Sequence, residues 1–204
     1  SATALQERLE RQGLPLAALP VQWVLLDKLA ASLTKWEKLS GALKARLLRS
    51  CKKYAVPETA AVLFTSGSES LPKAVPLSHA NLLANARDIV EVLHLDPNDS
   101  VLAMLPPFHS FGLMVNMVLP LSLGIRAAFH PNPTEAGPLA AMVRDYRLTL
   151  MAAPPTFLGA VLDRAKGTDH LASLRCAFVG AEKCQDHTYR AFAAQCPQAA
   201  LCEG

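Results

Sequence analysis

The sequence lacks the features that mark several classes of protein. Its 204 residues carry a net charge of only +3 and contain no zinc-finger spacing and no basic stripe interleaved with aromatics, which argues against nucleic acid as a partner. The five cysteines are odd in number and contain no CxxC pair, so neither a disulfide framework nor a structural zinc site is indicated. Buried thiols in a reducing cytoplasm fit this pattern best.

A continuous apolar segment long enough to cross a membrane is also missing. The longest stretch without a charged residue covers residues 100–125, which is long enough to raise the question. Pro106, Pro107 and Pro120 interrupt it, and lipid cannot satisfy the backbone groups that prolines leave without partners. We therefore expect two buried elements joined by a turn.

What the chain does have is the composition of a globular protein, with 51% hydrophobic and 18% charged residues. It begins at Ser1 without a methionine and ends on the apolar run "LCEG", so we expect a piece excised from a longer protein. The character of the sequence changes near residue 56, which divides a lead-in region, residues 1–56, from the remainder, residues 57–204.

Residues 57–204 alternate between strand-length apolar runs and helical periodicity. The clearest helix covers 78–95, with Ser78 as its N-cap. This alternation predicts an α/β fold with a parallel sheet and helices on both faces, in which ligands bind beyond the carboxyl ends of the strands. The expected strands are 60–64, 101–105, 125–129, 148–153 and 176–180.

Residues 1–56 show a different pattern. "LQERLERQ" (5–12) predicts a helix and "VQWVLLDKL" (21–29) a strand, and both precede a basic amphipathic helix over 34–53. Such a helix can lie on an anionic membrane surface or contact an acidic partner, and it can equally be a solvated helix packed on its own domain.

The loop "TSGSESLPKAVPLSH" (65–79) is rich in groups that can bind an anion. It is not a Walker phosphate loop, because Pro72 stands where that motif has the glycine before its lysine. Backbone amides, hydroxyls and a lysine can nevertheless hold phosphate, although serine, glycine and proline also populate ordinary surface turns. Composition alone leaves both alternatives open.

The amino-acid sequences of three segments resemble the motifs of a known protein family. The loop resembles the "TSGTTGxPKG" signature of the adenylate-forming, AMP-binding superfamily, which includes acyl and aryl CoA synthetases, luciferases and peptide-synthetase adenylation domains. "LPPFHSFGL" (105–113) and "VGAEKC" (179–184) resemble further family segments in the same order. Ser68, Glu69 and the Ser78–His79 pair make the loop most similar to the acyl-acyl-carrier-protein synthetase branch, which includes the synthetase part of 2-acylglycerophosphoethanolamine acyltransferase.

The resemblance implies a two-step ligase. ATP, with Mg²⁺, and a fatty acid would give acyl-adenylate and pyrophosphate, and the acyl group would then pass to a thiol of acyl carrier protein or CoA. Residues 57–204 would be part of the large N-terminal domain. The resemblance assigns ATP binding to a loop made of Thr65, Ser66, Gly67, Ser68, Glu69, Ser70 and Lys73. Thr65, Ser66, Ser68 and Lys73 would contact phosphate directly, and Glu69 would either help to hold the metal or anchor the loop. The backbone of Gly180, Ala181 and Glu182 would lie along the adenine and carboxylate, and Glu203 would be near the adenine amino group.

His109 is the one candidate catalytic residue. The resemblance places it near the acyl and adenylate pocket, while a histidine beside two phenylalanines, Phe108 and Phe111, can also be merely packed. The two phenylalanines are expected in the pocket wall or the core. Ser70 and Ala74 replace family glycines, so the loop either binds ATP more weakly or has a different shape.

The family's "YGxTE" segment, hinge and C-terminal domain with its catalytic lysine do not occur in the 204 residues, so these residues alone are expected to be almost inactive, with no complete catalytic or metal site. One rival is a non-catalytic anion- or lipid-surface-binding module that uses residues 34–53, in a parent associated with the membrane. Another nucleotide-dependent enzyme is disfavoured because the sequence has no GxGxxG fingerprint.

Overall fold

A computed structural model describes residues 10–11, 13, 26–46, 55–65 and 72–204, and divides the chain into two compact units, Ser1–Val56 and Pro57–Gly204. The first contains α2 (Leu26–Ser32) and α3 (Lys35–Arg46). The prediction of a strand over 21–29 is wrong from Leu26 onward, because leucine, lysine and alanine favour the helix that begins there. Residues 21–25 and 47–53, and most of the helix predicted over 5–12, lie outside the described residues.

The second unit begins with a hairpin. β1 (Thr59–Thr65) and β2 (Lys73–Ser78) pair antiparallel in a sheet of two strands. A strand over 60–64 is thus confirmed, but its expected place in the parallel sheet is wrong. The segment 66–72 is too short for a parallel connection, which needs about a dozen residues or more. β2 escaped prediction because Pro76 lies within it, and proline is confined to strand edges and ends.

Helix α4 (His79–Leu93) follows the hairpin directly and is capped as predicted. The Ser78 hydroxyl accepts a hydrogen bond from the Asn81 amide at 3.2 Å, and the Asn81 side chain accepts one from the Ser78 amide at 3.0 Å. This reciprocal capping box satisfies two backbone donors that the first turn leaves without partners. The apolar face of α4, which includes Leu82, Ala86 and Ile89, packs on Met114 and Leu119.

Replacing Ser78 with alanine is expected to remove this cap and lower the free energy of unfolding by about 1 kcal/mol. Urea unfolding followed by circular dichroism measures the change. Ser122→Ala, at an exposed position within a helix, is the matched control and should change stability much less. Equal losses in the two variants would contradict a capping role for Ser78.

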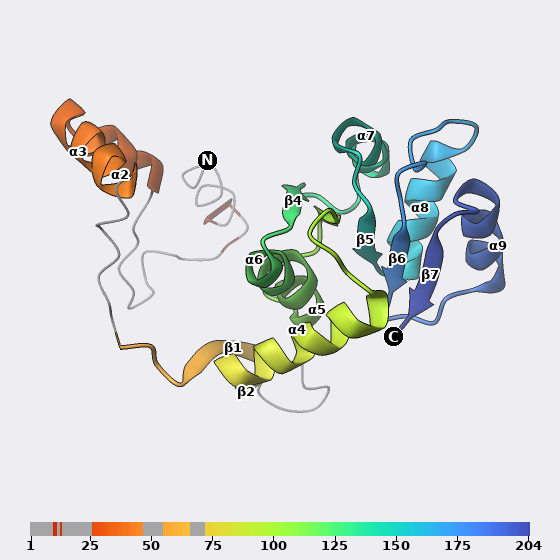
Figure 1. Ribbon diagram of the computed structural model, residues 1–204, viewed down its shortest axis with the longest axis horizontal. Coiled ribbons are helices and arrows are strands. Elements are labelled where there is room, and N and C mark those ends of the chain that lie inside the picture. Colours follow the sequence, from red (N-terminus) through yellow and green to blue (C-terminus); the bar gives the residue numbers. More distant parts are fainter. Residues whose placement is uncertain (1–9, 12, 14–25, 47–54, 66–71) are drawn as a thin grey trace. The chain divides into compact units, whose positions relative to one another are not determined.

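Five parallel strands form the central sheet. They are β3 (Ser100–Ala103), β4 (Arg126–Phe129), β5 (Leu150–Ala153), β6 (Cys176–Val179) and β7 (Ala200–Glu203), in the order β4-β3-β5-β6-β7. The α/β fold class is confirmed. The chain leaves β3 toward β4 and then crosses to β5 on the other side, so β3 and β5 flank a topological switch point (Figure 1).

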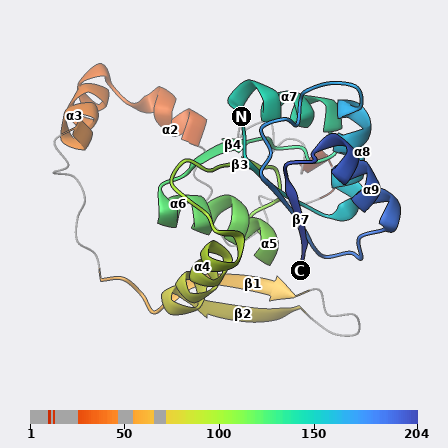
Figure 2. The ribbon, with the colours of Figure 1, turned by 45° about the vertical axis from the view of Figure 1, so that its right-hand side comes forward.

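Helices cover both faces of the central sheet (Figures 1 and 2), and alternate residues of the strands belong to the two cores beneath them. Leu102, Met151 and Ala177 share a core with the helices α7 (Ala136–Tyr146), α8 (Pro155–Ala165) and α9 (Asp186–Gln195). Val101, Leu150 and Cys176 share another core with Val115. That side carries α4 and the continuous helical segment made of α5 (Ser110–Gly112), η2 (Leu113–Val118) and α6 (Leu119–Leu123). Helices on both faces were predicted.

The uncharged stretch 100–125 contains β3 followed by the helical segment 110–123, which confirms two buried elements. In the part of the chain that the structure describes, no helix is long and apolar enough to cross a membrane.

Candidate active site

A cavity lies beyond the carboxyl ends of the strands. Its volume is about 410 Å³, and α4 and η2 contribute to its wall together with the segments that follow β6 and β7. Apolar side chains and glycine backbone dominate the lining, which includes Ser110, Phe111, Met114, Phe178, Gly180 and Gly204. The rings of Phe111 and Phe178 meet edge to face with centroids 5.5 Å apart. The cavity therefore suits an apolar ligand with a polar end.

The backbone after β6 is open to this cavity. A Cβ added at Gly180 would lie 3.1 Å from the carbonyl oxygen of Gly204 and 3.7 Å from the Phe111 ring, so any side chain there would intrude. Ala181 has a φ of 70°, a left-handed conformation that costs a non-glycine residue about 1 kcal/mol. Gly180 and Ala181, two of the predicted binding residues, thus line the cavity, and a strained turn shapes its rim.

Close contacts hold the segment 105–116, which contributes Ser110, Phe111, Met114 and Val115 to the cavity wall. Gly112 packs so closely on Pro106 that a Cβ would collide with the Pro106 carbonyl. Asn116 is 2% exposed and donates a hydrogen bond from Nδ2 to the carbonyl of Leu105 at 2.8 Å. It lies in the π-helical η2, a distortion frequent at functional sites. A positioning role for Asn116 was not predicted, although a single amide side chain within an apolar run indicates a buried polar contact.

His109 is exposed and precedes α5. Its amide donates to the Pro106 carbonyl at 3.2 Å, and its ring lies 4.7 Å from that of Phe108. Phe111 is in the cavity wall as expected, whereas the expectation for Phe108 is wrong: it is 69% exposed. The turn in which Phe108 lies precedes α5 and keeps the side chain outside both cores.

The two predicted carboxylates at this edge are held by partners the sequence analysis missed. Glu182 accepts a hydrogen bond from the Thr156 hydroxyl at 2.5 Å. Glu203 accepts one from the Cys184 amide at 2.9 Å and one from the Tyr189 hydroxyl at 2.6 Å. These bonds lower the pKa of Glu203, and the bond to Glu203 raises the pKa of Tyr189 to about 12. Glu203 therefore ties the end of β7 to the segment after β6.

Of the predicted phosphate loop, the structure describes the two ends. Thr65 and Lys73 lie opposite each other in the hairpin register and are both exposed. Neither lines the 410 Å³ cavity. Ser66, Gly67, Ser68, Glu69 and Ser70 lie outside the described residues. Within the described ranges no group of three His, Cys, Asp or Glu could hold a metal ion.

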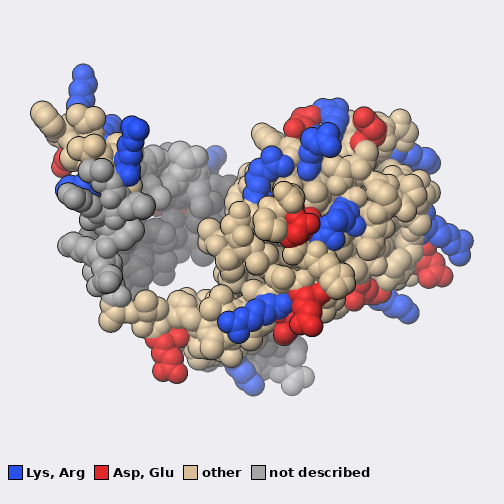
Figure 3. Space-filling view, viewed as in Figure 1, with Lys and Arg blue, Asp and Glu red and all other residues tan. Residues whose placement is uncertain are grey.

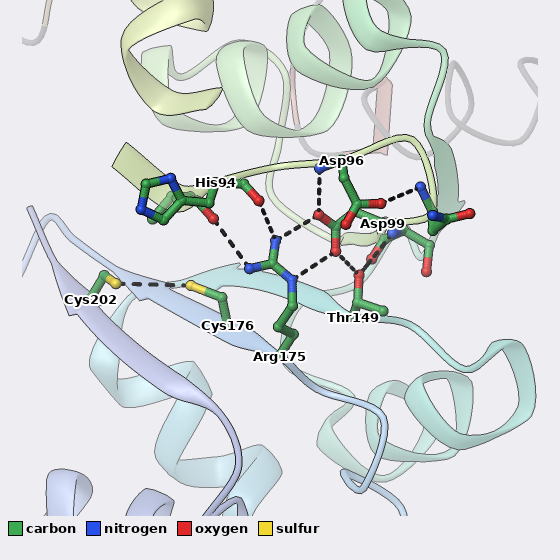
Figure 4. A network of polar contacts seen from close by, with 10 residues as sticks. His94, Asp96, Asp99, Thr149, Arg175, Cys176 and Cys202 are labelled. Carbon is green, nitrogen blue, oxygen red and sulfur yellow. Dashed lines mark hydrogen bonds and ion pairs between the residues drawn. The ribbon is translucent and has the colours of Figure 1, made fainter. Parts of the chain in front are cut away.

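At the opposite edge of the sheet, a polar network joins the amino ends of three strands (Figure 4). Arg175 binds the carboxylate of Asp99 with Nη2 at 2.6 Å and Nε at 3.1 Å, and Nη1 donates to the carbonyl of Leu93 at 3.2 Å. The Thr149 hydroxyl donates to Asp99 at 2.7 Å. This network fixes the end of α4 to the sheet, and α4 carries part of the cavity wall.

The Asp99 carboxylate is charged in this network. Burial raises the pKa of Asp99, but hydrogen bonds from Arg175, the Asp96 amide and Thr149 together outweigh it, so the pKa lies below its usual range. The same ion pair raises the pKa of Arg175. Both groups therefore stay ionised at neutral pH.

The doubly wound parallel sheet, with a cavity beyond its carboxyl ends, places the chain among the open α/β proteins, in which ligands bind at that edge of the sheet. Residues 10–204 match the AMP-binding enzyme family, and the chain belongs to that family. It is 31% identical to 4-coumarate–CoA ligase 3 of Arabidopsis thaliana over 153 residues, which are 72% of this chain and 27% of that ligase. The chain spans about a quarter of the curated relatives it matches.

Solved structures agree with this assignment. The chain superimposes on the AMPPNP-bound form of the nonribosomal peptide synthetase FmoA3 with a TM-score of 0.65 and 26% identity, over 72% of this chain and 16% of that one. It superimposes on the fatty acyl-adenylate ligase of L. pneumophila, solved with acyl adenylate and pyrophosphate, with a TM-score of 0.59 and 27% identity over 70% and 27% of the two chains. The predicted membership of the adenylate-forming superfamily is confirmed.

Proposed function

We propose that these residues belong to an ATP-dependent ligase that activates a fatty acid as its acyl-adenylate and transfers the acyl group to a thiol. The observation that carries the proposal is the 410 Å³ cavity beyond the strand ends, where Phe111, Met114 and Phe178 would enclose an acyl chain. Gly180 and Gly204 have no side chains, so the backbone that lines the cavity there would lie along the carboxylate and the adenylate.

The chemistry proposed for this site depends on the stabilisation of negative charge. A carboxylate must attack the α-phosphorus of ATP while charge accumulates on the departing pyrophosphate, and fixed donors with a lysine stabilise that charge. The segment from Thr65 to Lys73 would supply those donors. Mg²⁺ would neutralise the phosphates, Glu69 would either help to hold the metal or anchor the loop, and Glu203 would approach the adenine amino group.

The acceptor proposed is a carrier-protein thiol, with CoA as the alternative, because the "TSGSES" wording of the loop is most similar to acyl-acyl-carrier-protein synthetases. The 204 residues alone are proposed to be nearly inactive, since positioning by the remaining walls of a ligase site supplies much of the rate. Acyl-adenylate formation by the isolated 204 residues at the rate of a longer natural chain would overturn that part.

Exchange of labelled pyrophosphate into ATP tests the function in a longer natural chain that contains these residues. Exchange should depend on added fatty acid and vary with the length of its chain, because the cavity walls measure the acyl tail. Exchange that is insensitive to every fatty acid, or that responds instead to amino or aryl acids, contradicts the proposed substrate class.

Gly180→Val in the same assay should raise the KM for the fatty acid by about tenfold or more, since the new side chain enters the cavity beside Phe111. Gly159→Val is the matched control, because a Cβ at Gly159 meets nothing within 4 Å. An unchanged KM in Gly180→Val would place the acid elsewhere.

A second candidate function is contact with an anionic lipid surface through α3. Trp36 is 78% exposed and lies on one stripe with Leu39 and Leu43, which are also exposed. The basic residues of α3 are Lys35, Lys38, Lys44 and Arg46. Figure 3 shows basic and acidic side chains interspersed over the face drawn of Pro57–Gly204. The charge argument for a lipid surface therefore rests on α3.

Co-sedimentation with phosphatidylglycerol vesicles and with phosphatidylcholine vesicles tests this contact. Binding should require the anionic lipid and be lost when the four basic residues of α3 are changed to glutamate. Binding that ignores these charges, or no binding, removes the candidate.

A further inference from the structure

Two cysteines on neighbouring strands face each other outside the candidate active site. Cys176 of β6 and Cys202 of β7 have their sulfur atoms 3.9 Å apart, and both are free thiols (Figure 4). Cys176 is 3% exposed, while Cys202 is half-buried. Neither cysteine lines the 410 Å³ cavity, so the proposed ligase reaction assigns this dithiol no role.

The register of the strands disfavours a disulfide between them. Cys176 lies opposite Ala200, and Cys202 lies opposite Phe178, so the two cysteines are diagonal neighbours two positions apart along the strands. Diagonal neighbours in a sheet have Cα atoms about 7–8 Å apart, whereas a disulfide needs Cα atoms within about 6.8 Å and sulfurs at about 2 Å. Forming the bond would therefore require the strands to shift.

The observed spacing of the sulfurs suits a bridging metal ion instead. Two thiolates bound tetrahedrally at about 2.3 Å from a metal lie about 3.8 Å from each other. We propose that Cys176 and Cys202 form a binding site for a soft, thiol-seeking divalent metal ion of the zinc or cadmium type. Thiolates prefer such ions over hard cations such as Mg²⁺, so the site would not compete for the metal of the ATP reaction.

A metal ion can reach the pair from the side of Cys202. Cys202 is half-buried on the edge strand, and Cys176 borders a separate apolar cavity of about 210 Å³ under α4, between Ile89, Leu93 and Phe178. In the described part of the chain no third His, Cys, Asp or Glu joins the pair, so water or an external thiol would complete the coordination. The ion would tie the first residue of β6 to the third residue of β7.

Binding must displace protons. Burial, and then the neighbouring Cys202, raises the pKa of Cys176 to about 12, so the Cys176 thiol is protonated at neutral pH. The balanced step is one divalent ion plus two thiols giving a dithiolate complex and two protons, with no change of oxidation state. Proton release thus provides a readout that is separate from the affinity.

Titration of the 204-residue chain with Cd²⁺ alone tests the site. The thiolate-to-cadmium charge-transfer absorption should rise to one ion per chain, with release of two protons in weakly buffered solution. Cys202→Ala should lose at least about a hundredfold in affinity, because a single thiolate remains. Cys184→Ala, which removes a buried thiol away from the pair, is the matched control and should bind like the wild type.

Circular dichroism checks that each variant is folded, and Cys176→Ser provides a second disruption that keeps a group of similar size. Cadmium binding that survives both Cys202→Ala and Cys176→Ser overturns the proposal. So does a wild-type chain that binds no Cd²⁺, or one that diamide converts quantitatively to a disulfide between Cys176 and Cys202. None of these outcomes depends on ligase activity, so the proposed function is tested independently.

Discussion

Replacing Lys73 with methionine is expected to lower fatty-acid-dependent exchange of pyrophosphate into ATP by about a hundredfold to a thousandfold, the usual effect of removing one donor aimed at developing charge. Lys73 begins β2 directly opposite Thr65, so its ammonium lies at the end of the hairpin that bounds the proposed phosphate loop. Methionine keeps the length and removes only the charge. The assay is run in a longer natural chain that contains these residues.

Two controls make the Lys73 result interpretable. Lys166→Met removes an exposed lysine at the end of α8 and should leave exchange unchanged. Lys73→Arg keeps the charge and should retain more activity than Lys73→Met. Equal activity in Lys73→Met and Lys166→Met would show that this lysine does not hold phosphate.

Replacing Arg175 with methionine is expected to cost about 2–3 kcal/mol of unfolding free energy. The variant leaves the Asp99 carboxylate, whose side chain is 3% exposed, without its ion-pair partner. The Arg175 side chain is 40% exposed, which screens the pair and places the cost below that of a fully buried one. Urea unfolding measures the change, and Arg190→Met, an exposed arginine of α9, is the control.

The double variant Asp99→Asn with Arg175→Met distinguishes the contribution of the ion pair from the cost of leaving one buried charge without a partner. It should be more stable than Arg175→Met alone, because no buried charge is then left without a partner. The folded state lowers the pKa of Asp99, so the stability that the charged carboxylate contributes is present above the unfolded pKa, near 3.9, and is lost as pH falls through the lower folded value. A difference between wild type and Arg175→Met that does not shrink in acid would contradict this assignment.

Much of the fold could be predicted because the alternation of apolar strands and amphipathic helices along the sequence has a direct physical cause. Runs such as 101–105 and 176–180 are apolar at every position because the strands are buried on both faces, and helices with an apolar stripe cover them. The hairpin was harder to predict. β2 contains Pro76, which reads against a strand, and a run of apolar residues such as 60–64 does not reveal the direction of its partner.

The candidate site was predictable where a motif fixes the backbone and not where distant side chains meet. Gly180 and Ala181 follow β6 directly, so their place at the strand end follows from the sequence. Thr156 and Tyr189 are distant in sequence from the carboxylates they hold. Only the packing of α8 and α9 on the sheet brings them together, and a single sequence does not show that packing.

Hydrogen exchange of the chain with and without Mg²⁺–ATP and a fatty acid tests the central claim most directly, because it reports where ligand is held even without turnover. We expect the ligands to slow amide exchange in residues 59–78 and 178–184 and to leave the amides around Asp99 and Arg175 unchanged. No slowing at saturating ATP, or slowing confined to the edge that carries Asp99, would contradict the account.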